Sequence, residues 1–214
     1  RRCVGLPILI VAGFFLIYAL AVGLTNPAFF GRVKFLVRNL FYTKEGIFST
    51  PVNVCSKYIV VFIIFGAFLE RTGISNFFIQ LANCVAGKYA GGPAKVAVIS
   101  SALCGMVSGS SVGNTVTTGS VTIPMMKETG YKPEFAGAVE AASSTGGQIM
   151  PPIMGAAAFL MADFVGVSYS QIIVRAILPA ILYFAGIFIA VHLEAKKLGL
   201  SGIPKEELPV FKIL

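Results

Sequence analysis

A polar, glycine-rich interruption, Cys104-Gly-Met-Val-Ser-Gly-Ser-Ser-Val-Gly-Asn-Thr-Val-Thr-Thr-Gly-Ser120, lies inside an otherwise apolar run. In a lipid bilayer, irregular backbone is tolerated only where protein buries it or where it lines a wet cavity. A Gly/Ser break at membrane depth therefore predicts a discontinuous helix around a binding site. A second break, Ala142-Ser-Ser-Thr-Gly-Gly-Gln-Ile-Met-Pro-Pro152, follows in the next predicted span. We interpret the two breaks as halves of one binding region.

The composition predicts an integral membrane protein. Hydrophobic residues make up 56% of the 214 residues, charged residues make up 12%, and the mean hydropathy is +0.84. A soluble domain carries about 25% charged residues. The formal net charge of +8 fits loop Lys and Arg residues that meet anionic headgroups. No basic motif is interleaved with stacking aromatic residues, so we expect the lipid bilayer, and no nucleic acid, as a partner.

Several chemistries are disfavoured by the motifs. The chain has no GxxxxGK[ST] phosphate loop, which argues against ATP hydrolysis. Its four cysteines and single histidine lack zinc-site spacing. Asp163 is the only aspartate, so a paired-aspartate intramembrane protease is not supported. We therefore expect that the protein is not an enzyme, and that it has no catalytic residues and no organic cofactor. The chain begins with Arg rather than Met, and we expect it to be a piece of a longer protein.

The first part of the chain contains two predicted spans and two amphipathic helices. Leu6–Leu24 and Val52–Leu69 are apolar and long enough to cross about 30 Å of hydrocarbon. Phe29–Tyr42 has apolar residues at helical spacing with basic residues between them, which predicts a helix at the membrane surface; a solvated linker is the alternative. Phe77–Val85 is too short to span. The predicted segments are residues 1–50, 51–93, 94–200 and a linker at 201–214.

The apolar run Ala94–Met126 predicts a re-entrant helical hairpin. One straight helix of that length would overshoot the bilayer, whereas two arms joined at a Ser108–Asn114 tip would dip in and return. The positive-inside rule then places both ends of the hairpin in the cytoplasm. This topology leaves basic residues of the segment 32–44 outside, and an even number of full crossings without a hairpin is the alternative. The lysines that flank the hairpin are Lys88, Lys95, Lys127 and Lys132.

A broken helix and a returning helix are predicted after the hairpin. Pro133 fits a first helical turn, and the helix should break at Gly146-Gly147 and resume after Pro151-Pro152 toward Val165. Ile172–Val191 returns across the membrane. The predicted fold class is therefore all-α and integral to the membrane, with transmembrane helices, a re-entrant hairpin and a broken helix.

The hairpin tip offers bare backbone and hydroxyl oxygens. Gly105, Gly109 and Gly113 recur every fourth residue, which by itself is typical of close helix packing. For Gly105 packing and binding are equally good interpretations, but the density of Ser, Asn and Thr around the other two favours a site. Hard oxygens suit Na⁺, and N–H groups at a half-helix start suit a carboxylate. We expect Na⁺ at Ser108, Gly109, Ser110, Gly113, Asn114, Ser144 and Thr145, and substrate at Ser111, Asn114, Thr115, Thr145 and Gly147.

Two acids lie inside predicted spans. An unpaired charge is expensive there, so Glu140 and Asp163 are functional candidates. For Asp163 a position near the external headgroups is the alternative, and for Glu140 a structural hydrogen bond to a neighbouring helix. We take Glu140, Pro151 and Pro152 as gating or coupling candidates.

Two sequence blocks resemble a known transporter family. These blocks, Gly109–Met126 and Thr129–Pro152, are similar to the large membrane subunit of tripartite ATP-independent periplasmic (TRAP) transporters, and look closest to fused permeases that pair with TAXI-type binding proteins. The resemblance covers about 42–200. It implies an elevator-type, Na⁺-coupled importer of organic acids such as dicarboxylates in the bacterial cytoplasmic (inner) membrane. Its implied partners are a periplasmic substrate-binding protein, the rest of the permease and a small membrane subunit or its fused equivalent.

The same resemblance implies that this chain is about one repeat of a larger protein. The family's large subunit has a second, inverted repeat with its own hairpin, and this sequence supplies only one. We therefore expect no transport by the chain alone. A non-transporting membrane scaffold and an ion-channel segment are the alternatives. A scaffold has no evident use for Gly146-Gly147 and Pro151-Pro152 in one span, since each pair weakens the helix.

Overall fold

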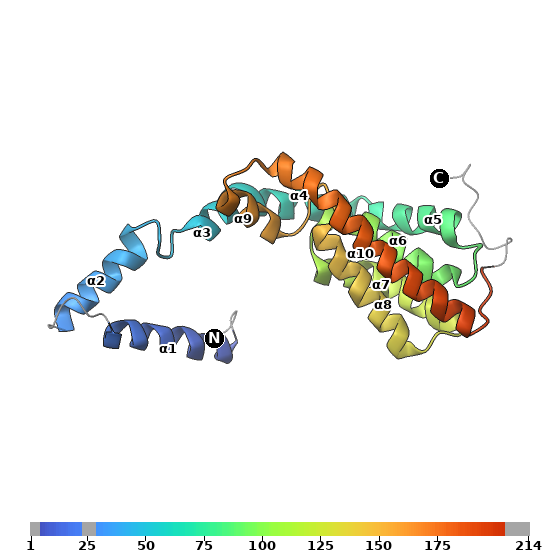
Figure 1. Ribbon diagram of the computed structural model, residues 1–214, viewed down its shortest axis with the longest axis horizontal. Coiled ribbons are helices and arrows are strands. Elements are labelled where there is room, and N and C mark those ends of the chain that lie inside the picture. The colour runs from blue at the N-terminus through green and yellow to red at the C-terminus, as the bar shows by residue number, and fades with distance from the viewer. Residues whose placement is uncertain (1–4, 23–28, 204–214) are drawn as a thin grey trace. The chain divides into compact units, whose positions relative to one another are not determined.

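Helices form all the regular secondary structure in the residues that the structure, a computed structural model, describes: 5–22 and 29–203 (Figure 1). A π-helical turn, Cys55–Ile59, joins α3 to α4, and a 3₁₀ turn, Gly147–Ile149, follows α8. The helices are α1 Leu6–Val22, α2 Phe29–Tyr42, α3 Thr50–Val54, α4 Val60–Arg71, α5 Ile74–Ala86, α6 Gly92–Ser108, α7 Ser111–Glu128, α8 Pro133–Gly146, α9 Ala156–Val165 and α10 Tyr169–Lys197.

The chain forms two compact units, Arg1–Ser56 and Lys57–Leu214. In the first unit, α1 packs on α2, and α2 has the bounds that the sequence predicted for an amphipathic helix. Its position at a membrane surface stays a prediction. The last two residues of the predicted span Leu6–Leu24, and 204–214 of the predicted linker, lie outside the described residues.

Two helical stretches in the described residues are long and apolar enough to cross a membrane, Thr50–Leu69 and Tyr169–Lys197. Only 6% and 11% of their most apolar windows are buried. The core helix of a soluble protein would be mostly buried, so this exposure favours contact with lipid. The second stretch is α10, which extends beyond the predicted Ile172–Val191 at both ends.

A helical hairpin is present as α6 and α7, which pack against each other and reverse the chain between them. Its re-entrant course in the membrane stays a prediction. Gly109 ends α6 with a left-handed φ of 59°, a conformation that favours glycine. Ser110 caps α7, and its Oγ accepts a hydrogen bond from the Gly113 N–H at 3.2 Å. The non-helical tip is therefore narrower than the predicted Ser108–Asn114, because a Ser-Gly-Ser sequence supplies the stop and the next start together. Asn114 lies in the first turn of α7.

The predicted break after α8 is also present. Beyond the 3₁₀ turn the chain stays non-helical until α9, and Met154 adopts a positive φ of 55°. The Gly155 N–H donates to the Gln148 carbonyl at 2.7 Å. The Tyr169 hydroxyl at the start of α10 donates to the Pro152 carbonyl at 3.0 Å. These bonds replace the helical pattern that Gly147 and the prolines interrupt.

The base of the hairpin packs against α8 and α10, and α10 crosses α6 and α8 in Figure 1. Tyr131, in the loop before α8, is buried and stacks on Phe135. Burial, and to a lesser extent the Glu194 carboxylate, raises the pKa of Tyr131 to about 12, so the phenol stays neutral. The buried core here comprises Ala94, Ala97, Val98, Met126, Tyr131, Ala136, Val139, Val191 and Ala195.

One of the four flanking lysines does not lie on the surface. Lys95 is only 4% exposed, and its ammonium nitrogen lies 5.9 Å from the centre of the Tyr89 ring and 5.5 Å from that of Phe188. Such cation–π contacts stabilise a partly desolvated lysine. Lys88, Lys127 and Lys132 are exposed.

Two glycines allow the hairpin to contact the break at backbone distance. A Cβ atom built on Gly105 would lie 2.3 Å from the Gly147 Cα, and one on Gly147 would lie 2.7 Å from the Gly105 Cα. Closer to the tip, a Cβ on Gly109 would lie 2.2 Å from the Met154 carbonyl oxygen. The packing interpretation of Gly105 is therefore confirmed. Gly113 differs, because a Cβ there would make only ordinary contacts with Ser110.

We expect Gly105→Ala to destabilise the complete permease by about 1–3 kcal/mol, because the added methyl group must displace backbone. The measurement is the apparent melting temperature of the purified protein in detergent.

Gly137→Ala is the matched control, since Gly137 is also inside a helix but nothing lies within 4 Å of an added Cβ. It should leave the melting temperature unchanged or raise it. Equal melting temperatures for the two variants would contradict the close contact.

Candidate functional site

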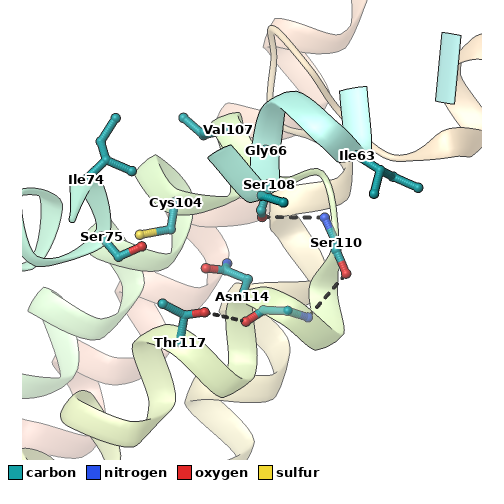
Figure 2. A pocket seen from close by; sticks show the side chains of 12 residues that line it. Ile63, Gly66, Ile74, Ser75, Cys104, Val107, Ser108, Ser110, Asn114 and Thr117 are labelled. Atoms are coloured by element: carbon teal, nitrogen blue, oxygen red, sulfur yellow. Dashed lines mark hydrogen bonds between the residues drawn. The ribbon is translucent and has the colours of Figure 1, made fainter. Parts of the chain in front are cut away.

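A cavity of about 350 Å³ lies beside the tip of the hairpin (Figure 2). α4 and α5 supply mostly apolar walls, and the tip and the first turns of α7 supply polar atoms. Within the described part of the chain, the lining carries no charged side chain. The site is therefore neutral and mostly apolar, with most of its polar atoms on the side of the tip and of α7. It is lined by Ile63, Gly66, Ala67, Ile74, Ser75, Cys104, Val107, Ser108, Ser110, Gly113, Asn114 and Thr117.

Asn114 is the most constrained polar group of this lining. Its side chain is 1% exposed, and its Nδ2 donates to the Ser101 carbonyl at 2.8 Å. This bond fixes which way the amide faces. Its Oδ1 atom is buried and accepts no hydrogen bond from any residue that the structure describes. Leaving such an acceptor unpaired costs about 1–3 kcal/mol. A ligand bound at Oδ1 would remove this cost, which makes Oδ1 the candidate ligand-binding atom of this cavity.

The tip serines lie between two cavities. Ser108 and Ser110 line the first cavity and also, with Gly109, a second one of about 290 Å³ on the side of the break. The Ser108 Oγ accepts from the Ser110 N–H at 3.5 Å, and the Ser110 Oγ caps α7. Each hydroxyl oxygen retains a further lone pair. Ser108 and Ser110 at the tip therefore line both cavities.

A glutamine in the break, for which the sequence predicted no role, contacts the start of α7. The Gln148 Nε2 donates to the Ser111 Oγ at 2.8 Å. A Cβ on Gly147 would lie 3.4 Å from the Asn114 Nδ2. The structure therefore brings Ser111, Asn114 and Gly147 together, as expected for two halves of one region.

Three other predicted ligands use their hydroxyl groups within their own helices. Thr115 donates to the Ser111 carbonyl at 2.8 Å, and Thr145 donates to the Ala141 carbonyl at 2.7 Å. Ser144 donates to Glu140, four residues before it. None of the three lines either cavity, and their roles stay predictions. Pro151 and Pro152 lie in the break, where their peptide bond is cis.

Glu140 is completely buried, whereas Asp163 is exposed. The Glu140 carboxyl group contacts hydroxyl groups from α6, α7 and α8. Its Oε1 is 2.9 Å from Ser101 Oγ, 2.5 Å from Thr118 Oγ1 and 2.9 Å from Ser144 Oγ, and its Oε2 is 2.5 Å from Thr122 Oγ1.

The sequence predicts roles for Glu140 and Ser144 but none for their partners on the hairpin. A signal was present, because Asn114, Thr118 and Thr122 follow at intervals of four and share one face of α7. Glu140 and Ser144 have the same interval on α8. Matching polar faces on adjacent helices predict contact.

Two helices of 17 and 18 residues that reverse at a glycine, and a broken helix that packs against them, are the arrangement expected of a discontinuous-helix site in a helical membrane protein. The family model for the DctM component of tripartite ATP-independent periplasmic transporters matches residues 1–213. The chain belongs to this family. It is accordingly an integral membrane protein and part of a transporter permease rather than an enzyme.

Curated relatives carry several substrate names. The C4-dicarboxylate TRAP transporter large permease protein DctM of Pseudomonas aeruginosa is 26% identical over 162 residues, 76% of this chain and 38% of that protein. The sialic acid TRAP transporter permease protein SiaT of Haemophilus influenzae is 26% identical, covering 67% of this chain and 23% of that protein. The isethionate TRAP transporter permease protein DctMQ of Oleidesulfovibrio alaskensis is 28% identical, covering 68% and 24%. The chain spans about a third of the length of the first relatives.

Proposed function

We propose that this chain is one repeat of the permease of a Na⁺-coupled secondary transporter that imports organic acids across the bacterial cytoplasmic membrane. The observation that carries the proposal is the unpaired, buried Asn114 Oδ1 at a neutral cavity beside the hairpin tip. A scaffold that only packs helices has no use for an acceptor whose burial costs stability.

The chemistry of the lining suits a small monovalent cation. Na⁺ binds hard oxygen ligands, and broken helices in transporters supply them from carbonyl and hydroxyl groups. The Asn114 Oδ1 and the Ser108 and Ser110 hydroxyls are such atoms. A neutral shell binds a cation less tightly than one with a carboxylate. That suits an ion that must be released on the other side of the membrane in every transport cycle.

The start of α7 supports an anionic substrate. The first N–H groups of a helix have no partner in its own hydrogen-bond ladder and carry a partial positive charge. At this start, Gln148 and Ser111 bring the break against the tip. The names of the relatives give C4-dicarboxylates, sialic acid and isethionate as substrates, all organic anions. Isethionate is a sulfonate rather than a carboxylate. The proposal that the substrate is a carboxylate is therefore narrower than the proposal that it is an organic anion.

The partners follow from the family and from the length of the chain. We propose that a periplasmic binding protein delivers the substrate and that a second, inverted repeat completes the site. A small membrane subunit, or its fused equivalent, is a further partner in this proposal; the name DctMQ of one relative supports a fused form. A TAXI-type binding protein stays a prediction. In this assembly α6 and α7 are re-entrant and open to the cytoplasm.

We expect Asn114→Ala, in the complete permease with its partners, to raise the Na⁺ concentration for half-maximal uptake about tenfold. The reason is that one neutral ligand is worth about 1–3 kcal/mol. The measurement is substrate uptake into proteoliposomes across a series of Na⁺ concentrations.

Ser120→Ala is the control, because Ser120 is exposed and its hydroxyl donates to the Thr117 carbonyl of its own helix. It should leave the Na⁺ dependence unchanged. Unchanged Na⁺ dependence in Asn114→Ala, with normal expression and folding, would favour a packing motif over an ion site.

A labelling experiment tests the topology of the hairpin. Cysteines introduced at Lys88 and Lys127, in a background without native cysteines, should both react with an impermeant maleimide only from the cytoplasmic side. Both positions are exposed at the base of the hairpin, whereas Lys95 is too buried to report. Labelling of the two positions from opposite sides would show a full crossing instead of a re-entrant hairpin.

A further inference from the structure

The buried carboxyl group of Glu140 connects three helices at one point. It comes from α8 and meets Ser101 of α6 and Thr118 and Thr122 of α7, at 2.5–2.9 Å. Its side chain is 0% exposed and lines neither cavity beside the tip. A Cβ on Gly119 would lie 3.0 Å from the Glu140 Cγ, so the side chain is also packed tightly against α7. Glu140 therefore touches the hairpin but not the candidate site.

A short chain of contacts links Glu140 to the candidate ligand. Ser101 donates its hydroxyl to the Glu140 Oε1, and its carbonyl accepts from the Asn114 Nδ2 at 2.8 Å. Thr118 contacts the Glu140 Oε1 and also lies 2.8 Å from the Asn114 carbonyl oxygen. Both routes end on Asn114, once at its side chain and once at its backbone.

We propose that Glu140 is a positioning residue that holds Asn114 with its Oδ1 directed at the cavity. This proposal depends on the proposed function only for the identity of the ligand that Asn114 Oδ1 binds. By fixing Ser101 and Thr118, the carboxyl group fixes the rotamer of Asn114 and joins the hairpin to α8, so that the two move together. Supporting shells of this kind decide whether a ligand is held in the geometry that binds.

The bonding pattern shows which property of Glu140 is needed. Three of the four hydroxyl contacts are made to Oε1. Only Thr122 contacts Oε2, and the Thr122 hydroxyl has a second acceptor, the Thr118 carbonyl, at 3.0 Å. A glutamine keeps the oxygen in place of Oε1 and can donate from its amide to Thr122, which then donates to that carbonyl. An amide can therefore replace the acid, whereas alanine leaves the hydroxyl groups of the hairpin without their shared acceptor.

The test uses the complete permease with its partner subunits, with Cys104 as the sole cysteine. Cys104 lines the cavity next to Asn114 and is 6% exposed. Its rate of alkylation in Na⁺-free medium reports the fit of the hairpin independently of any ion. We expect Glu140→Ala to raise this rate about tenfold, the effect of losing a buried hydrogen-bond acceptor. Glu140→Gln should remain close to the parent protein.

Uptake provides the second readout. Glu140→Ala should raise the half-saturating Na⁺ concentration more than it lowers the maximum rate, whereas a loss of folded protein would lower only the maximum rate. The matched controls, Glu134→Ala and Glu134→Gln, change an exposed acid on the same helix and should have no effect. If the Glu140→Ala permease is not produced in the membrane, Ser101→Ala replaces it in this test. Ser101→Ala removes the hydroxyl that links Glu140 to Asn114 through residue 101, and it should also raise the alkylation rate of Cys104.

The outcomes separate this inference from the proposed function. Unchanged Cys104 alkylation in Glu140→Ala, or in Ser101→Ala where that variant is needed, would overturn the positioning role. A Glu140→Gln permease as defective as Glu140→Ala would also overturn it, because the negative charge of Glu140, and not its hydrogen-bonding pattern, would then be the property that matters. If Glu140→Ala speeds the alkylation of Cys104 but Asn114→Ala leaves the Na⁺ dependence of uptake unchanged, the positioning role stands and the ion site is refuted.

Discussion

The contact between Gly105 and Gly147 is the constraint on which the site depends. Because neither residue has a side chain, the backbone of the hairpin and that of the broken helix meet directly. Other contacts between the two breaks lie near that approach. Gln148 then reaches Ser111, and the amide of Asn114 lies close to the backbone of Gly147. A larger residue at either glycine would push the two backbones apart and so weaken the hydrogen bonds between the two halves.

The sequence was sufficient for the order of the helices and for both breaks, because glycine and proline act locally. A left-handed turn at Gly109 and a serine cap at Ser110 need only neighbouring residues. The tip was predicted too wide because polar residues were equated with unwound backbone, although Asn114 is helical and uses its side chain at the site.

The composition of the site was harder to predict, because its members are distant in the chain. The walls from α4 and α5 carry no polar pattern that marks them as a lining, and only tertiary packing places Ile63 or Ile74 beside Asn114. Lys95 was counted among the lysines that place the base of the hairpin in the cytoplasm, but it is buried there against two aromatic rings. The partners of Glu140 could have been found, since matching polar intervals on α7 and α8 are visible in the sequence.

The position of the buried acid also bears on how the site can work. A carboxylate in the cavity would hold a cation strongly, since charge interactions strengthen where water is excluded. Glu140 instead lies behind the lining, and its oxygens are occupied by four hydroxyl groups. The cavity is left with neutral atoms held in fixed orientations. In the proposed function this arrangement separates two demands on a transport site: Glu140 would keep the geometry rigid, and neutral oxygens such as Asn114 Oδ1 would bind the ion reversibly.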